Sequence, residues 1–268
     1  MRVLVTGGAG YVGSHTVRRL QAAGHDTWVF DNLSTGHPEA VRSSPIVVGD
    51  LADRKSLHYA LNRTRFDAVI HFAGVATVAE SVSDPLAYYR QNVTNTLNLL
   101  DAMRAFEIRR LVVSSSCAVY GNPDGSPVTE KTMPRPISPH GRSKLIIEQM
   151  LADCAAAYGM GSVALRYFNA AGAHADGSLG EDHLPEHHLI PLALQVALGQ
   201  RSHLKILGTD YATPDGSAIR DYVHVDDLAD AHLAALEAVQ PGTSDCFNLG
   251  LGRGWSVRDV IRACEEVT

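Results

Sequence analysis

The 268-residue sequence has few features that would suit a membrane, a nucleic acid or an oxidising compartment. No apolar run approaches the ~20 residues that a helix needs to cross a bilayer. The first apolar run starts at residue 2, so we expect no signal peptide. The net charge is −6 and there is no basic patch, so nucleic acid is not an expected partner. With 45% hydrophobic residues, the chain is instead typical of a soluble protein with a large core.

Cysteines and metal-ligand motifs are also scarce. The four cysteines lie far apart without metal-ligand spacing, which suits a reduced cytoplasm: Cys117, Cys154, Cys246 and Cys264. Three of the 13 histidines, His183, His187 and His188, gather around Glu186. Such a group could bind a metal, but a polar loop before a helix is the better explanation, and we expect no metal site.

What the sequence does contain begins at its N-terminus, where a short apolar run leads into closely spaced glycines. Residues 2–5 are followed by Gly7, Gly10 and Gly13, and then by apolar residues at helical spacing. This order predicts a strand, a tight turn and a helix. In such a unit the backbone can approach a pyrophosphate, and the helix N-terminus stabilises its charge. The spacing alone also fits a simple strand-to-helix turn.

A carboxylate at the end of the next strand makes cofactor binding the better interpretation. The apolar run 27–30 ends at Asp31, where a carboxylate can accept hydrogen bonds from an adenosine ribose. The same carboxylate would repel a 2′-phosphate, and no arginine follows immediately, so we expect NAD rather than NADP. The alternative interpretation of Asp31 is a solvated turn residue before Asn32.

Apolar and helical segments then alternate, which predicts a doubly wound parallel sheet of the Rossmann type with helices on both faces. Expected strands are 46–48, 68–71, 111–114 and 162–167, and expected helices are 53–62, 85–106 and 141–158. Ligands in such folds lie beyond the carboxyl ends of the strands. We divide the chain into an NAD-binding domain, residues 1–168, and a smaller substrate-binding region interleaved with the sheet, residues 169–268.

The second region is less regular. We expect, in order, a polar loop at 174–188, a helix at 189–198, a short strand at 204–207, a loop at 209–218, a return to the sheet edge at 222–223, a helix at 225–239, a strand at 247–250 and a helical stripe at 257–267. The last helix stops at Thr268 without a capping glycine.

Several motifs occur in an order that resembles the UDP-glucose 4-epimerases of the extended short-chain dehydrogenase/reductase family. They are Thr6 to Gly13, Asp31-Asn32, Gly49-Asp50-Leu51, His71 to Gly74, Glu80-Ser81-Val82, Ser114 to Gly121, Ser138 to Lys144, Leu165 to Asn169 and Arg220 to Val225. The resemblance implies a homodimer with tightly bound NAD. In such enzymes NAD takes hydride from C4 of UDP-glucose or UDP-galactose, leaves a 4-keto intermediate, and returns the hydride to the other face.

By position, the resemblance implies residues for each ligand. Cofactor contacts would come from Gly7, Gly10, Tyr11, Val12, Asp31, Asn32, Asp50, Leu51, Phe72, Ala73, Gly74, Asn92, Ser114, Lys144 and Tyr167. UDP-sugar contacts would come from Ser116, Asn169, Leu189 and Arg220. A guanidinium fork matches diphosphate oxygens, although Arg220 could instead pair with Asp221. The resembled proteins continue beyond the last helix to complete this pocket, so we infer truncation. If the polypeptide ends at Thr268, we expect weak UDP-sugar binding.

The expected catalytic residues are Ser116, His140 and Lys144, and His140 stands where the resembled enzymes have a tyrosine. His140 and Lys144 share one face of the expected helix. Three interpretations remain open. An imidazole, with an ordinary pKa of about 6.5, would be largely neutral and could accept the C4 hydroxyl proton. The position could be disabled, leaving a protein that binds both ligands and turns over poorly. Ser116 or a water could also take over part of the role.

Other classes fit the residues less well. Cys117 and Ala118 occupy the stretch where nucleotide-sugar dehydratases carry an acidic pair, so we do not expect dehydration. A UDP-glucuronate decarboxylase would need a site for the sugar carboxylate, and we identify none in the sequence. A non-enzymatic binding module draws its support from His140 alone, and the presence of Ser116 and Lys144 argues against it.

Overall fold

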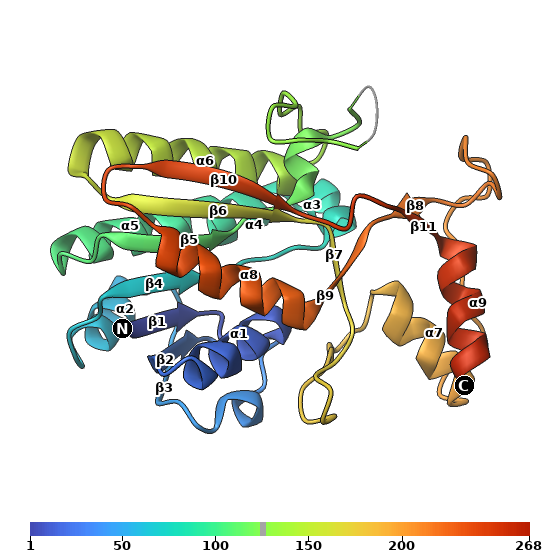
Figure 1. The fold of residues 1–268 in the computed structure, drawn as a ribbon, viewed down its shortest axis with the longest axis horizontal. Helices are drawn as coiled ribbons and strands as arrows, with labels where there is room; N and C mark the ends of the chain where they lie inside the picture. Colours follow the sequence, from blue (N-terminus) through green and yellow to red (C-terminus); the bar gives the residue numbers. More distant parts are fainter. Residues whose placement is uncertain (124–126) are drawn as a thin grey trace.

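The protein is built around a seven-stranded parallel sheet, as a computed structural model that describes residues 1–123 and 127–268 shows (Figure 1). The strand order is β10-β6-β5-β4-β1-β2-β3, which confirms the predicted doubly wound fold. The strands of this sheet are β1 (Arg2–Thr6), β2 (Asp26–Asp31), β3 (Ile46–Val48), β4 (Ala68–His71), β5 (Arg110–Ser114), β6 (Gly161–Tyr167) and β10 (Ser244–Leu249).

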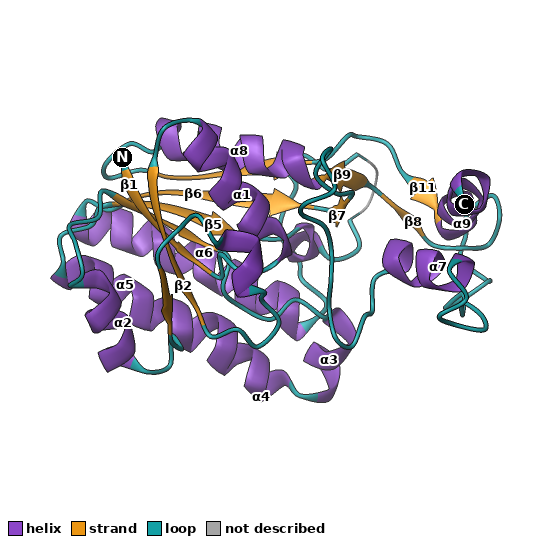
Figure 2. Ribbon diagram, turned by 90° about the horizontal axis from the view of Figure 1, so that it is seen from below, coloured by secondary structure: helices purple, strands orange, loops and turns teal. Residues whose placement is uncertain are grey.

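Helices cover both faces of the sheet (Figure 2). Helices α1 (Tyr11–Ala22) and α8 (Val225–Ala238) lie on one face, and α2 (Arg54–Leu61), α5 (Asn95–Ala105) and α6 (Pro139–Tyr158) lie on the other. Alternate strand residues serve the two sides: Leu4 belongs to one core cluster, whereas its neighbours Val3 and Val5 belong to the second. Both faces are therefore buried, which is why the strands are continuous apolar runs.

Shorter elements complete the chain. They are η1 (Pro38–Val41), α3 (Val78–Ser83), α4 (Pro85–Tyr88), the π-helical turn η2 (Tyr89–Thr94), η3 (Cys117–Tyr120), β7 (Asn169–Ala171), α7 (Leu189–Ala197), β8 (Ile219–Arg220), β9 (Tyr222–His224), β11 (Trp255–Ser256) and α9 (Val257–Val267). Elements α7, α9, β8 and β11 lie together beyond one end of the sheet (Figure 1). None of the helices in the described ranges is long and apolar enough to cross a membrane.

The helix expected over 85–106 forms as one continuous helical stretch made of α4, the π-helical turn η2 and α5. Two other expectations about regular structure are wrong. The strand expected at 204–207 does not form: this segment has no regular structure and no strand partner in the described ranges. The return to the main sheet at 222–223 is made elsewhere: β9 pairs with β7, and β10 occupies the place beside β6.

Helix α6 has clear local causes. Ser138 caps it by accepting a hydrogen bond from the Gly141 amide, and Pro139 fills the first helical position. The helix ends at Gly159, whose φ of +67° suits glycine. Between these ends, its apolar side packs on the sheet through Ile147 and Leu151, each 2% exposed.

A buried ion pair fixes the register of α6 against the sheet. Arg166 on β6 donates two hydrogen bonds to the Glu148 carboxylate, at 2.9 and 2.5 Å, and both side chains are at most 10% exposed. Arg166 also donates to the Tyr120 hydroxyl at 2.8 Å, and Ser115 donates to Glu148 at 2.5 Å. Bidentate geometry of this kind is directional as well as strong, so α6 cannot slide without breaking it.

We expect Arg166→Met to lower the free energy of unfolding by about 3–5 kcal/mol, because it leaves the Glu148 carboxylate buried without its cation. Urea denaturation measures the loss. The matched control is Arg18→Met, which removes an exposed pair with Asp176 and should cost under about 1 kcal/mol. Equal effects of the two substitutions would contradict the anchoring role of Arg166.

Candidate active site

A cleft of about 2020 Å³ lies where the strands of the main sheet end. The glycine turn after β1 and the ends of β2, β4, β5 and β6 line one side of it, and residues from α7, β8 and the loops around them line the other. Pockets for one drug-sized ligand usually measure about 300–1,000 Å³. This cleft therefore has room for two such ligands side by side.

The glycine turn is shaped for a close approach to an anion. Gly7 has a φ of +70°, and a Cβ there would lie 2.5 Å from the Ala73 nitrogen. A Cβ on Gly13 would lie 2.2 Å from the Gly7 carbonyl oxygen. Helix α1 begins at Tyr11 after Gly10, which has no side chain to cap the first amides. Those amides are free to bind a pyrophosphate at the positive end of the helix.

The ends of β2 and β3 form a polar corner at one end of the cleft. Asp31 is 7% exposed and accepts hydrogen bonds from the Ala9 and Leu33 amides, at 2.9 and 2.8 Å. The Asn32 amide donates to Asp50 at 2.8 Å. A buried carboxylate held in this way suits the two hydroxyl groups of a ribose and disfavours a 2′-phosphate.

At the other end of the cleft, a close contact brings the start of α6 against η3. A Cβ on Gly141 would lie 2.3 Å from the Ala118 carbonyl oxygen, so only glycine fits. This contact places His140 and Ser116, from two segments distant in sequence, on the wall of the same cleft. The Ser116 hydroxyl accepts a hydrogen bond from the Ala118 amide at 3.1 Å.

His140 is buried, and its ring is short of hydrogen-bond partners. It is 4% exposed, with the Tyr88 ring edge-on at 6.3 Å between centroids. Burial lowers its pKa to about 4, with help from the Lys144 cation and against a hydrogen bond to the Val75 carbonyl. Its Nδ1 has no hydrogen-bond partner within residues 1–123 and 127–268. At neutral pH the ring is therefore uncharged.

Lys144 lies one turn further along α6 and is held against the sheet. Its Nζ donates a hydrogen bond to the Ser114 carbonyl at 2.7 Å, and the side chain is 8% exposed. Burial lowers its pKa to about 8, and Glu148 opposes this shift. The Ser114 and Tyr167 hydroxyls, both also on the cleft wall, lie 2.5 Å apart.

Asn92 is the one expected site residue that lies behind the cleft rather than on its wall. Its amide accepts from the Val75 nitrogen at 2.9 Å and donates to the Val75 carbonyl at 3.1 Å and to Ser143 at 3.0 Å. It therefore ties the loop after β4 to α6. The turn η2 carries Asn92, and π-helical turns often occur at functional sites.

The expected UDP-sugar residues Asn169, Leu189 and Arg220 all line the cleft. Arg220 forms no ion pair with Asp221 within the described parts of the chain. The Asp221 carboxylate instead accepts hydrogen bonds from two backbone amides in the loop after β10, those of Leu251 and Gly252. The guanidinium is exposed and can turn toward an anion.

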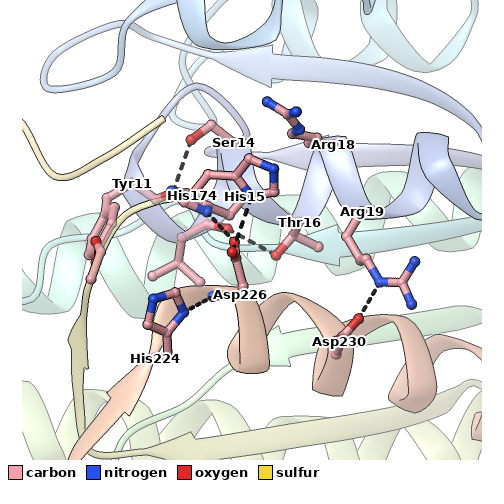
Figure 3. A network of polar contacts seen from close by, with 12 residues as sticks. Tyr11, Ser14, His15, Thr16, Arg18, Arg19, His174, His224, Asp226 and Asp230 are labelled. Carbon is pink, nitrogen blue, oxygen red and sulfur yellow. Dashed lines mark hydrogen bonds and ion pairs between the residues drawn. The ribbon is translucent and has the colours of Figure 1, made fainter. Parts of the chain in front are cut away.

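Some cleft residues escaped the sequence analysis. Lys205 and Arg253 add positive charge to the wall, and only their basic character in polar loops could have indicated them. Beside the glycine turn, the Asp226 carboxylate bridges His15 Nδ1 at 2.7 Å and His174 Nδ1 at 3.0 Å (Figure 3). This bridge joins α1, α8 and the loop after β7, which are far apart in sequence.

Comparison with known proteins identifies relatives over the whole chain. The model of the NAD dependent epimerase/dehydratase family matches residues 3–250. A UDP-glucose 4-epimerase of Halalkalibacterium halodurans is 49% identical over 100% of this chain and 80% of its own length. One from Azospirillum brasilense is 51% identical over 100% of this chain and 77% of its own length.

Solved structures are equally similar. UDP-glucose 4-epimerase from Brucella ovis in complex with NAD superimposes with a TM-score of 0.93 at 51% identity, over 98% of this chain and 81% of that one. The enzyme from Bifidobacterium longum, in complex with NAD⁺ and UDP, gives a TM-score of 0.95 at 39% identity, over 99% and 83%.

We expect the buried, neutral His140 to make the protein less stable in acid. Its pKa is about 4 in the fold and about 6.5 when unfolded, so the unfolded chain binds the proton more readily. Stability is then greatest above about pH 6.5 and falls between about pH 6.5 and 4, by about 3 kcal/mol in total. His140→Gln should flatten this slope in urea denaturation at several pH values. Parallel curves for the two proteins would contradict the assignment.

Proposed function

The chain belongs to the NAD-dependent epimerase/dehydratase family, and we propose that its cleft carries out the 4-epimerisation of a UDP-hexose with Ser116, His140 and Lys144 around the reacting carbon. NAD is the cofactor, and UDP-glucose and UDP-galactose are the substrate and product. The observation that carries the residue assignment is the uncharged imidazole of His140 on the cleft wall, one helical turn before Lys144.

The residues of the cleft fit NAD. The turn at Gly7, Gly10 and Gly13 offers backbone amides to the pyrophosphate, and Asp31 offers a carboxylate to the adenosine ribose. To the Lys144 ammonium, which is anchored on the Ser114 carbonyl, we assign the contact with the nicotinamide ribose. The nicotinamide, when bound, would supply hydride transfer from sugar C4 and back to the same carbon.

The proton of the C4 hydroxyl needs an acceptor while the hydride leaves. A neutral imidazole has one ring nitrogen that carries no proton and can accept one. We assign this role to the His140 ring, which lines the cleft. Ser116 would hold the C4 oxygen by a hydrogen bond, which leaves the proton transfer to His140.

His140 is a weak base in this position. Its pKa of about 4 lies about 2.5 units under the ordinary imidazole value, so protonating it costs about 3 kcal/mol more. The ideal catalytic pKa lies near the working pH. We therefore propose slow epimerisation rather than an inactive site.

Two further features belong to this proposal. Exposed apolar side chains on α5 and α6, including Leu97 and Tyr158, support a homodimer formed through these helices, which light scattering at micromolar concentration tests by the mass of the particle. All four cysteines are free, which supports a cytoplasmic location.

Dehydration is not supported, because the Cys117 thiol beside Ser116 has a pKa raised by burial to about 11 and offers no acidic pair.

We expect His140→Tyr to raise the turnover number for UDP-galactose by about 10- to 100-fold, because a phenolate beside Lys144 is a stronger base than the buried imidazole. A coupled assay for UDP-glucose measures this. Ser116→Ala, made in the natural protein and in the His140→Tyr variant, measures the contribution of the serine separately. A natural protein with no turnover at all, beside an active tyrosine variant, would show that the base is absent.

The pH profile of the natural protein gives a second check. Only the neutral imidazole can accept the proton, and its pKa is lowered to about 4, so the rate should stay level above about pH 6 and fall toward pH 4. Circular dichroism of the same samples separates titration from unfolding. The tyrosine variant should instead lose activity as acid protonates its phenolate at higher pH.

We expect Gly13→Ala to weaken NAD binding by about 5- to 150-fold, because its Cβ would meet the Gly7 carbonyl and displace the turn at a cost of about 1–3 kcal/mol. Calorimetry on protein stripped of nucleotide measures the affinity. Gly180→Ala, where a Cβ meets its nearest neighbour at 3.5 Å, is the matched control. Unchanged affinity in the Gly13 variant would place the pyrophosphate elsewhere.

A further inference from the structure

Four side chains that can ligate a metal converge in the loop before α7. They are Glu181, His183, Glu186 and His188, called here the Glu/His cluster, and one ligand atom from each lies within 4.8 Å of the others. His187 lies in the same loop but is not part of the cluster. The sequence analysis considered the three histidines, overlooked Glu181 and expected no metal.

Three distances within the Glu/His cluster match those between ligands around one ion. His183 Nδ1 lies 3.6 Å from Glu181 Oε1 and 3.6 Å from Glu186 Oε2. These distances are too long for hydrogen bonds. Two ligands at 2.0–2.2 Å from a tetrahedral metal stand about 3.3–3.6 Å apart. His188 Nδ1 lies 3.4 Å from Glu186 Oε1, and 2.6 Å from Glu181 Oε1, where it forms an ordinary hydrogen bond that a metal would replace.

The two carboxylates of the cluster are buried, whereas the His188 side chain is 63% exposed. The side chains of Glu181 and Glu186 are 9% and 4% exposed, so two carboxylates are held close together with little water to screen them. His183 Nδ1 is buried without a hydrogen-bond partner within residues 1–123 and 127–268. A buried polar atom is normally paired with protein, water or an ion.

We propose that the Glu/His cluster binds one divalent transition metal ion of the zinc class. Two imidazoles and two carboxylates form a donor set that zinc accepts in tetrahedral geometry. Magnesium and calcium prefer six or more oxygen ligands, so imidazoles at half of the positions disfavour them.

The place of the cluster gives the ion a structural role. Asp182, between two of the ligands, contacts the His37 ring through its carbonyl oxygen at 3.1 Å, and His37 precedes η1. The pKa of Tyr11, beside the glycine turn, is raised mainly by burial and also by the negative charge of Glu181. The loop thus reaches from α7 to the adenosine and pyrophosphate end of the cleft, and a bound ion would fix it there.

A second cluster of possible ligands provides the contrast. The two hydrogen bonds of Asp226, to His15 at 2.7 Å and to His174 at 3.0 Å, use the donor atoms that a metal would need (Figure 3). The ligand atoms of this second cluster are therefore all hydrogen-bonded, whereas His183 Nδ1 in the Glu/His cluster is not, and we assign the second cluster no ion.

The test is zinc binding by the full chain with its nucleotide retained. After dialysis against a chelator, competition with a chromogenic zinc indicator should give one tight site for each chain. His183→Asn and Glu186→Gln should each weaken that site by at least about 100-fold, since even outer-shell changes cost 10–100-fold. His174→Asn is the matched control and should bind zinc like the natural chain.

Two further measurements keep the result interpretable. Cobalt substitution should give the intense visible absorption of a four-coordinate ion in the natural chain and lose it in the His183 variant. Thermal melting without metal shows whether each variant is folded. The proposal is overturned if the natural chain takes up no stoichiometric zinc at micromolar free metal, or if folded His183 and Glu186 variants bind it equally well. Because no outcome depends on turnover, the epimerase assignment is tested separately.

Discussion

The arrangement of the active site depends on the buried ion pair between Glu148 and Arg166. Glu148 follows Lys144 by one helical turn, as Lys144 follows His140, so one face of α6 carries the anchor, the cation and the proposed base. The bidentate contact with β6 fixes that face against the sheet. Without it, neither the Lys144 contact with the Ser114 carbonyl nor the position of His140 would be determined.

The same charges have opposite consequences for a phenol and for an imidazole. A cation beside a tyrosine favours the phenolate, which is the basic form, and so prepares the base. A cation beside a histidine also favours the deprotonated form, but it lowers the basicity of a ring that is already neutral at pH 7. Lys144 and burial both act in this direction on His140. The chain therefore keeps the electrostatics suited to one base while presenting another.

The sequence predicts the elements whose conformation depends mainly on neighbouring residues. The buried strands, the turn at Gly7 and Gly13, and Asp31 at the end of β2 could be read because an apolar run or a glycine spacing reports them directly. The segment 204–207 could not, since an apolar alternation does not say whether a partner strand is present. The π-helical turn that carries Asn92 likewise depends on its contacts with Val75 and Ser143.

Contacts between distant segments could not be predicted from the sequence, for a different reason. Asp226 lies more than 200 residues from His15, and nothing local to either residue indicates the other. Glu181 lies in the stretch 174–188 that the sequence predicts to be a polar loop, whereas its side chain is 9% exposed. Burial of a polar loop is decided by what the rest of the chain lays over it, and that is a property of the whole fold.

The two ends of the cleft are held to different degrees, and this matches what each ligand must do. Around the glycine turn, the second half of the chain is tied down by the Tyr11 hydroxyl on the Gly172 carbonyl at 2.6 Å and by the Asp226 bridge to His15 and His174. The elements α7, α9, β8 and β11 extend away from the sheet at the other end (Figure 1). A cofactor that must stay through two hydride transfers benefits from the closed end, since every tie there slows its release. A nucleotide sugar that must enter and leave in each cycle needs the looser end, where opening breaks fewer contacts with the sheet.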